Sequence, residues 1–250
     1  MHRFFVAPSA LQHQTVTLTG PQAHQIAVVL RLRPGERIVV LDNSGWQYLV
    51  ELQTVTPQRV VGRICERSLA TTEPRVKLTL YQGLIRAPKF ELVLQKCTEI
   101  GVVAFVPVLC ARSLVTSADE TRPAKFERWQ RIIAEAAEQS GRGKLPVLHP
   151  VTTFGQACRQ ARGLALLAHE RAPARPLRTV LQTVERPFAV SLFIGPEGGF
   201  APEEVAQAQD YGIVPVALGP RILRAETAAI VATALVLYTL GDMDEPSHGG

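Results

Sequence analysis

The chain has 250 residues, of which 46% are hydrophobic and 20% are charged, which marks an ordinary globular protein of one or two domains. Its formal net charge of +5 favours polyanionic partners only weakly. The longest apolar stretch of the C-terminal part, residues 225–240, is too short to span a membrane and is typical of a buried helix.

The first seventy residues predict a small β-rich domain. Their β-branched, partly alternating runs lie at 15–20, 36–43, 46–52 and 59–66, separated by turn residues such as Pro34-Gly35 and Pro57. One helical segment, residues 21–32, interrupts them. Short strands at this spacing predict a small barrel, which we assign to residues 1–72.

From residue 76 onward, strands alternate with helices. We expect strands at 76–84, 104–110, 145–151, 164–170, 189–194 and 214–219, and helices at 87–101, 124–141, 154–161, 202–212 and 225–240. Such alternation is typical of an α/β domain with a largely parallel sheet, assigned here to residues 73–250. In the helix at 124–141, four apolar residues share one face: Phe126, Trp129, Ile133 and Ala136.

A glycine-rich turn, SLFIGPEGGFAPEEV at 191–205, lies between a strand and a helix, where nucleotide phosphates often bind. It matches neither G-x-x-x-x-G-K-[ST] nor G-x-G-x-x-G. Glu197, Glu203 and Glu204 would repel a phosphate at the helix N-terminus, whereas a neutral or cationic ligand such as S-adenosylmethionine fits. The alternative is a tight turn whose acidic residues only cap the helix.

A second stretch, LGPRILRAETAAIVATALVLY at 218–238, leads from a short strand into a helix that is apolar on every side. Such a helix must be buried, against its own domain or against a second subunit. Arg224 and Glu226 at its start therefore lie near a buried site. The alternative, compatible with a site, is an Arg224–Glu226 ion pair that fixes the helix start.

Six motifs together resemble one family of the SPOUT methyltransferases, which methylates N3 of the uridine at position 1498 of 16S ribosomal RNA. They are HRFFV (2–6), VLRLRPGE (29–36), KFELVLQKCTEIGV (89–102), ERWQRIIAEAAEQSGRGKLP (127–146), FIGPEGGF (193–200) and LGPRILRAETAAI (218–230). The resemblance covers nearly the whole chain, and the last two motifs are its most specific part.

The resemblance implies a C-terminal SPOUT α/β domain with a trefoil knot and an N-terminal PUA-like β-barrel that binds RNA. It also implies a homodimer and S-adenosylmethionine as cofactor. Carried over by motif, the cofactor-binding residues are Leu167, Ala168, Ile194, Gly195, Pro196, Gly198, Gly199, Leu218, Gly219, Ile222, Leu223 and Thr227.

The chemistry of this reaction requires that uridine N3 lose its proton before it attacks the methyl group. Arg224 is suited to stabilise the negative charge on the deprotonated uracil, and Glu226 or Glu197 could take the proton. For contact with RNA we expect basic residues of the motifs and junctions: Arg3, Arg31, Arg33, Arg86, Lys89, Arg142 and Lys144.

Two alternative functions are compatible with the same fold: a SPOUT methyltransferase that acts on another rRNA or tRNA site, and a catalytically inactive RNA-binding homologue. The four cysteines form no C-x-x-C pair and no histidine completes a zinc site, so we expect reduced thiols and no metal. The N-terminal apolar stretch is too short for a signal peptide, and we expect a cytoplasmic protein without a membrane partner.

Overall fold

The computed structural model describes residues 1–114, 123–170, 174–185 and 187–244. The chain divides into two compact units: Met1–Glu73 with Ala134–Leu145 form unit 1, and Pro74–Ile133 with Pro146–Gly250 form unit 2. The domain boundary at residues 72 and 73 stays a prediction. The sequence pattern did not indicate that residues 134–145 group with the N-terminal unit.

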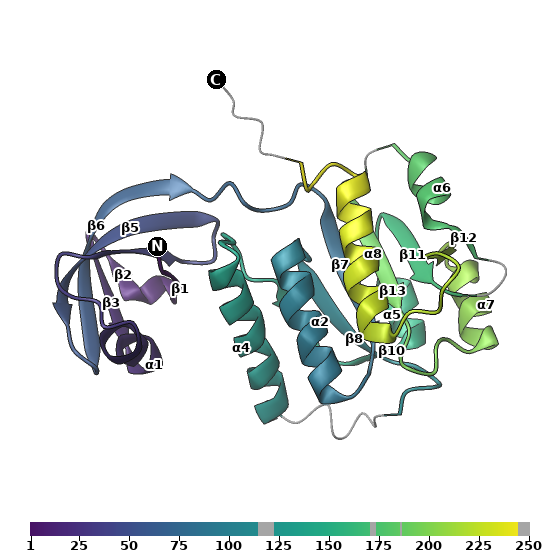
Figure 1. The fold of residues 1–250 in the computed structure, drawn as a ribbon, viewed down its shortest axis with the longest axis horizontal. Helices are drawn as coiled ribbons and strands as arrows, with labels where there is room; N and C mark the ends of the chain where they lie inside the picture. The colour runs from purple at the N-terminus through teal and green to yellow at the C-terminus, as the bar shows by residue number, and fades with distance from the viewer. Residues whose placement is uncertain (115–122, 171–173, 186, 245–250) are drawn as a thin grey trace. The chain divides into compact units, whose positions relative to one another are not determined.

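Unit 1 is built on one six-stranded sheet with the strand order β1-β4-β5-β6-β3-β2 (Figure 1). β1 is parallel to β4, and the other neighbours are antiparallel. The strands are β1 (Arg3–Phe5), β2 (Leu11–Gln12), β3 (Thr15–Thr19), β4 (Arg37–Leu41), β5 (Trp46–Val55) and β6 (Arg59–Leu69). Alternate apolar residues of β3 and β4 face Ala23 and Ile26 of the helical segment in one core.

The helical segment of unit 1 is shorter than predicted. A 3-10 turn, η1 (Pro8–Ala10), lies earlier in the chain; α1 (Gly20–His24) continues as the π-helical turn η2 (Gln25–Val29). Arg31 has φ 55°, a left-handed conformation that is incompatible with a continuing helix. Backbone geometry therefore ends the helix before the apolar pattern ends.

Residues 134–145 are bound to the rest of unit 1 through Glu73. Its carboxylate accepts hydrogen bonds from Arg142 Nε at 3.2 Å and Nη2 at 2.7 Å, and from the backbone N–H of Gly143 at 3.0 Å. Burial raises the pKa of Glu73, but these hydrogen bonds and the Arg142 charge outweigh burial and hold it below its ordinary value. Glu73 is therefore ionised at neutral pH and holds residues 134–145 to the rest of unit 1.

Unit 2 contains a parallel sheet with the strand order β10-β8-β7-β13-β11-β14-β12, and β9 pairs with β8. Its strands are β7 (Lys77–Gly83), β8 (Ala104–Leu109), β9 (Val147–Leu148), β10 (Thr152–Thr153), β11 (Leu164–Ala168), β12 (Arg175–Pro176), β13 (Ala189–Ile194) and β14 (Val214–Ala217). The pair β12 and α6 was not predicted, and only two residues of the strand expected at 145–151 form β9.

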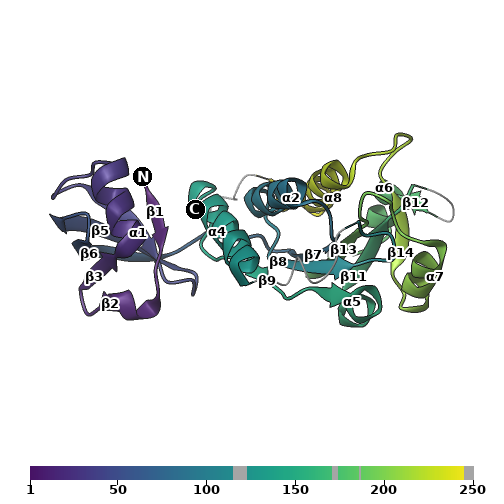
Figure 2. The same ribbon diagram turned by 90° about the horizontal axis from the view of Figure 1, so that it is seen from below.

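Helices cover both faces of this sheet (Figure 2). They are α2 (Ala87–Ile100), α4 (Pro123–Gln139), α5 (Phe154–Gln160), α6 (Leu177–Gln182), α7 (Pro202–Asp210) and α8 (Ala225–Thr239). Leu166 and Leu192 belong to the core beneath α2 and α8, whereas Leu167 and Phe193 belong to the core beneath α5 and α7. Strands buried on both faces explain why their sequences are almost continuously apolar.

Helix α8 is buried on one side only. Ala229, Ala232 and Val236 are fully buried, but Leu235 is 42% exposed and Tyr238 67% exposed. The sequence pattern predicted that this helix is buried against its own domain or against a second subunit. Its own domain buries one side of the helix. The described fold is thus a β-rich N-terminal unit and a parallel α/β unit; the knot stays a prediction.

Candidate active site

The candidate site lies where three loops meet at the carboxyl edge of the parallel sheet, the usual ligand position in such folds. The loops follow β11, β13 and β14, whose neighbours are fixed by the pairings β7-β13-β11-β14. They enclose a cavity of about 340 Å³. Its lining residues are Lys89, Ala168, Glu170, Ile194, Gly195, Pro196, Glu197, Gly198, Gly199, Phe200, Ile222, Leu223, Arg224, Ala225 and Ala228.

The glycine turn after β13 is held tightly by its surroundings. Phe193 stacks on Tyr81 of β7 at a centroid distance of 4.3 Å, and Phe200 packs against Phe154 at 5.4 Å. Aromatic anchors in the core therefore fix both ends of the turn. Between them Gly199 has φ 67°, which strongly favours glycine over residues with a side chain.

The end of β7 approaches this turn so closely that no side chain fits between them. A Cβ atom on Gly83 would lie 2.6 Å from the backbone nitrogen of Pro196. The Gln82 amide donates to the carbonyl oxygens of Gly83 at 2.9 Å and Gly195 at 3.4 Å, and so bridges the two strand ends. Sequence reasoning missed Gln82. The available signal was a polar residue in a largely apolar strand, and the structure shows that this side chain is only 1% exposed.

The three carboxylates of the turn have different surroundings. Glu204 is buried and accepts hydrogen bonds from the backbone N–H groups of Ala201 and Ala111, both at 2.8 Å. Glu203 is exposed and does not line the cavity. Glu204 thus caps α7 and ties it to the loop after β8, as the alternative interpretation of the turn proposed, whereas Glu197 lines the cavity.

Lys89 of α2 lies between two carboxylates from distant parts of the chain. Its Nζ is 3.5 Å from Glu197 Oε1 and 3.6 Å from Glu226 Oε2. The backbone N–H of Arg86 also donates to Glu197 Oε1 at 3.4 Å. The Oε2 atoms of Glu197 and Glu226 are buried and, within the described part of the chain, have no hydrogen bond.

Arg224 is exposed at the start of α8 and lines the same cavity. Among the described residues it has no ion pair, so the Arg224–Glu226 pair considered as an alternative does not form. Glu226 pairs with Lys89 instead. The guanidinium is therefore available to a ligand.

Most of the residues predicted to bind the cofactor line this cavity or an adjoining recess of about 70 Å³. The recess shares Ala168, Ile222 and Leu223 with the cavity and adds Leu218 and Gly219. Leu167 does not line either, because its side chain is fully buried in the core. Thr227 is exposed on α8 and also lines neither.

The residues predicted to contact RNA differ in their surroundings. Arg31, Arg33 and Lys144 in unit 1 and Arg86 in unit 2 are exposed. Arg3 is half-buried and donates to Gln47 at 2.7 Å. Lys89 engages the two carboxylates described above.

The prediction for Arg142 needs correction. This side chain is buried, and its guanidinium binds Glu73 through two nitrogens. A phosphate contact would break this pair and leave a buried carboxylate without its partner. Arg142 therefore has a structural role in unit 1.

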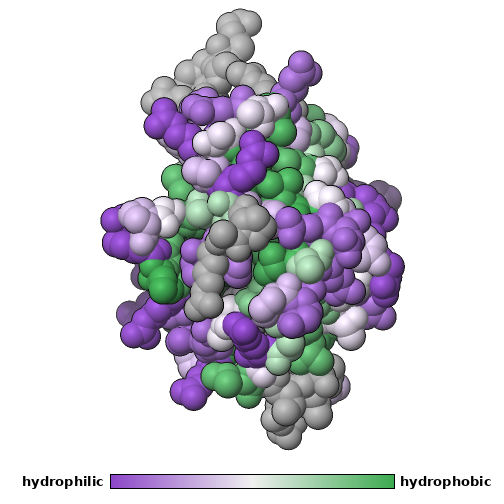
Figure 3. Space-filling model, turned by 90° about the vertical axis from the view of Figure 1, so that its right-hand side faces the viewer, coloured by the Kyte–Doolittle hydropathy of each residue, from purple (hydrophilic) through white to green (hydrophobic). Residues whose placement is uncertain are grey.

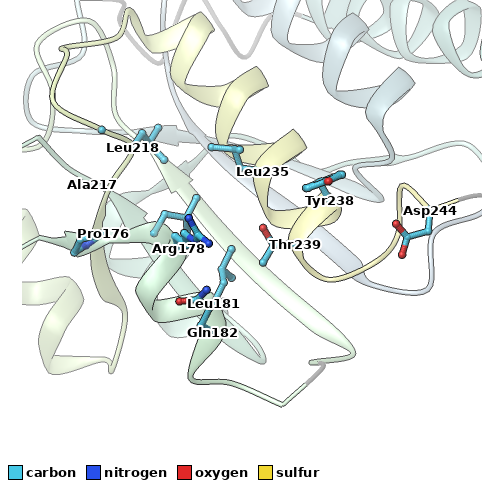
Figure 4. A pocket seen from close by; sticks show the side chains of 12 residues that line it. Pro176, Arg178, Leu181, Gln182, Ala217, Leu218, Leu235, Tyr238, Thr239 and Asp244 are labelled. Carbon is cyan, nitrogen blue, oxygen red and sulfur yellow. The ribbon is translucent and has the colours of Figure 1, made fainter.

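A larger, more apolar groove of about 670 Å³ lies between α6 and α8 (Figure 4). Leu181 and Gln182 of α6 line it from one side, and Leu235 and Tyr238 of α8 from the other. Figure 3 shows further hydrophobic residues at the surface on the side of unit 2 that carries α6 and α7. Apart from Leu218 and Gly219, none of the predicted site residues lines this groove.

Two further searches cover only the described residues. No cluster of three or more histidine, cysteine, aspartate or glutamate residues there could hold a metal ion. No helix there combines the length and apolar character needed to cross a membrane.

Comparison with known proteins links this geometry to RNA modification. Residues 72–237 match the family model described as an RNA methyltransferase domain, and residues 18–65 match that of an RNA methyltransferase PUA domain. The chain is 38% identical to a ribosomal RNA small subunit methyltransferase E of Synechocystis, over 94% of this chain and 77% of that one. It is 31% identical to the protein of that name in Bacillus subtilis, over 95% and 96%.

A crystal structure of a ribosomal RNA small subunit methyltransferase E from Neisseria gonorrhoeae, bound to S-adenosyl methionine, is also similar. It superposes with a TM-score of 0.85 at 31% identity and covers 95% of this chain and 97% of its own. At this likeness, the whole chain and not only one domain corresponds to the solved protein.

Proposed function

The chain belongs to the ribosomal RNA small subunit methyltransferase E family, and on that premise we propose that it methylates N3 of the uridine at position 1498 of 16S ribosomal RNA with S-adenosylmethionine. One observation carries the proposal. The two most specific motifs of the sequence, separated by 17 residues, line one cavity of about 340 Å³ together with Lys89.

The residues of this cavity fit S-adenosylmethionine. Gly195, Gly198 and Gly199 expose backbone rather than side chains, which lets a flat adenosine approach closely. The buried oxygens of Glu197 and Glu226 favour a ligand with positive charge. A phosphate-bearing cofactor would meet repulsion from the same two carboxylates.

When bound, S-adenosylmethionine supplies a methyl group on a positively charged sulfur. The protein's own task is to place uracil and to handle the N3 proton. Arg224 lines the cavity and has no ion pair to another described residue, so it can stabilise the negative charge on deprotonated uracil. Glu226 and Glu197 are the candidate bases, because each has one buried oxygen without a hydrogen bond to any described residue.

The homodimer is part of the proposal. Leu235 and Tyr238 expose apolar surface on α8 beside the 670 Å³ groove, and Ile222 is 83% exposed. Exposed apolar residues around a groove are typical of an interface. Because the substrate is a ribosomal subunit, we place the enzyme in the cytoplasm.

The RNA-binding residues are proposed separately for each unit. In unit 1 they are Arg3, Arg31, Arg33 and Lys144, and in unit 2 Arg86, all with side chains at least partly accessible. Each contact to a phosphate would contribute a salt-dependent part of the affinity. Single substitutions of these residues should weaken binding of 30S subunits more at low salt than at high salt, because salt screens the contact that is lost.

Methyl transfer tests the function. Labelled S-adenosylmethionine is incubated with small ribosomal subunits that lack their own N3 mark, and the modified base is mapped by mass spectrometry. We expect a single 3-methyluridine at position 1498. A mark at another position would make the chain a methyltransferase of another site, and cofactor binding without any transfer would make it an inactive homologue.

Arg224→Ala tests the assigned role within that assay. Turnover should fall by at least about 100-fold while the Kd for S-adenosylmethionine stays within about threefold, as for loss of a group that acts on the transition state. Arg221→Ala is the matched control, since this exposed arginine of the same loop lines only the small recess. Equal loss of binding and turnover in Arg224→Ala would refute the role.

A further inference from the structure

The charges around Lys89 do not balance. One ammonium group lies 3.5 Å from Glu197 and 3.6 Å from Glu226, so two carboxylates share a single cation. Both carboxylates are largely buried, with side chains 18% and 14% exposed. One negative charge therefore remains uncompensated in a partly dehydrated recess, where it is costly unless a cation joins it.

The other cationic side chain that lines the cavity does not compensate this charge. Arg224 lines the same cavity, but it is exposed and has no ion pair with either carboxylate. Glu197 Oε2 marks this deficit, because it is buried and has no hydrogen bond among the described residues, whereas Glu226 Oε2 is the oxygen that lies 3.6 Å from Lys89 Nζ. A bound ligand with positive charge would complete the group.

We infer that Lys89, Glu197 and Glu226 form a charge filter that lets this pocket hold the sulfonium form of the cofactor and release the neutral thioether product. The inference rests on the proposed function. In methyl transfer the bond from sulfur to the methyl carbon breaks, and its electron pair stays on sulfur. The bond from that carbon to uracil N3 forms, and the N3 proton passes to a base.

Methyl transfer changes the net charge of the bound ligand, while the charges of the pocket stay the same. The cofactor carries a net charge of +1 and the product carries none, while the adenosine, amino and carboxylate groups are the same in both. A surplus negative charge therefore attracts the cofactor more strongly than the product. The reaction itself therefore weakens the attraction that holds the ligand and favours release of the product.

Lys89 acts in this filter by limiting the surplus charge. With both carboxylates unpaired, the pocket would carry two uncompensated charges. This role differs from an RNA contact by Lys89, which the sequence motif suggested. A lysine that binds RNA phosphate would leave the balance between cofactor and product unchanged when replaced.

Calorimetric titrations with S-adenosylmethionine and S-adenosylhomocysteine, in mildly alkaline buffer and without RNA, test the inference. The quantity compared is the ratio of the two Kd values, product over cofactor. Glu197→Gln and Glu226→Gln should each lower this ratio by roughly tenfold, since each removes one negative charge from the pocket. Lys89→Met should raise it by a similar factor, and Lys89→Met with Glu226→Gln should return it toward the wild-type value.

Controls separate the possible failures. Glu203→Gln removes a carboxylate from the first turn of α7 that does not line the cavity, and should leave the ratio unchanged. Product binding reports on folding of each variant, because it does not depend on the filter. Equal ratios in all variants, or equal weakening of both ligands, would overturn the inference. A wild-type chain that binds neither ligand would instead refute the proposed function.

Discussion

Replacing Gly83 with alanine tests whether the contact between β7 and the glycine turn shapes the cofactor pocket. The new Cβ would lie 2.6 Å from the nitrogen of Pro196, 2.7 Å from its Cδ and 2.9 Å from the carbonyl carbon of Gly195. The shortest of these is about 0.8 Å below ordinary contact, and two of the three atoms belong to backbone that cannot rotate away. The turn must therefore move.

The expected effects follow from that displacement. Overpacking of this kind costs about 1–3 kcal/mol, which lowers the Tm by roughly 2–12 °C for a chain of this size. A shift approaching 1 Å in a wall of the cofactor pocket should reduce methyl transfer by up to about 100-fold. Differential scanning calorimetry measures the Tm, titration with S-adenosylmethionine measures the affinity of the pocket, and the ribosomal assay measures methyl transfer.

Gly155→Ala is the matched control. It lies in α5, where an added Cβ would meet only the flexible side-chain ends of Gln207 at 3.3 Å and Arg159 at 3.8 Å. Alanine there should be neutral or stabilise by up to about 1 kcal/mol. If Gly83→Ala bound cofactor and turned over like this control, the close approach of β7 would not be what positions the turn.

Three further predictions concern other parts of the molecule. Glu73→Gln removes the charge that the buried Arg142 pairs with and should lower the free energy of unfolding by about 3 kcal/mol at neutral pH. Because the folded-state pKa of Glu73 lies below its ordinary value, the wild-type advantage should persist above that ordinary value and vanish as the pH falls through the lowered one. Urea titrations across pH would show this loss, and a pH-independent difference would contradict it. A thiol reagent should modify one cysteine in the native protein and four after denaturation, because only Cys65 is exposed. Burial raises the pKa of Cys97 to about 12 and keeps the other buried thiols unreactive, so early modification of a second thiol would contradict this prediction. Tyr238→Asp should halve the mass measured by light scattering if α8 forms the dimer interface, and an unchanged mass would place that interface elsewhere.

The local pattern of the sequence determined the elements and much of the pocket wall. Periodicity placed the helices of unit 2 except α6, and Trp129 and Ile133 of α4 lie in the core as expected. The glycine turn and its acidic residues excluded a phosphate cradle from sequence alone, because that chemistry depends on neighbours a few residues apart. Resemblance to a family supplied the cofactor and the reaction.

Only the tertiary structure decided which charges meet. Lys89 contacts Glu197 and Glu226, which are more than a hundred residues away in the chain, and no local pattern encodes such a meeting. For the same reason Arg142, in an exposed-looking glycine-rich segment, proved to be buried against Glu73. Side-chain identity fixes what a residue can do, but burial and partners, which depend on the packing of distant segments, fix what it does.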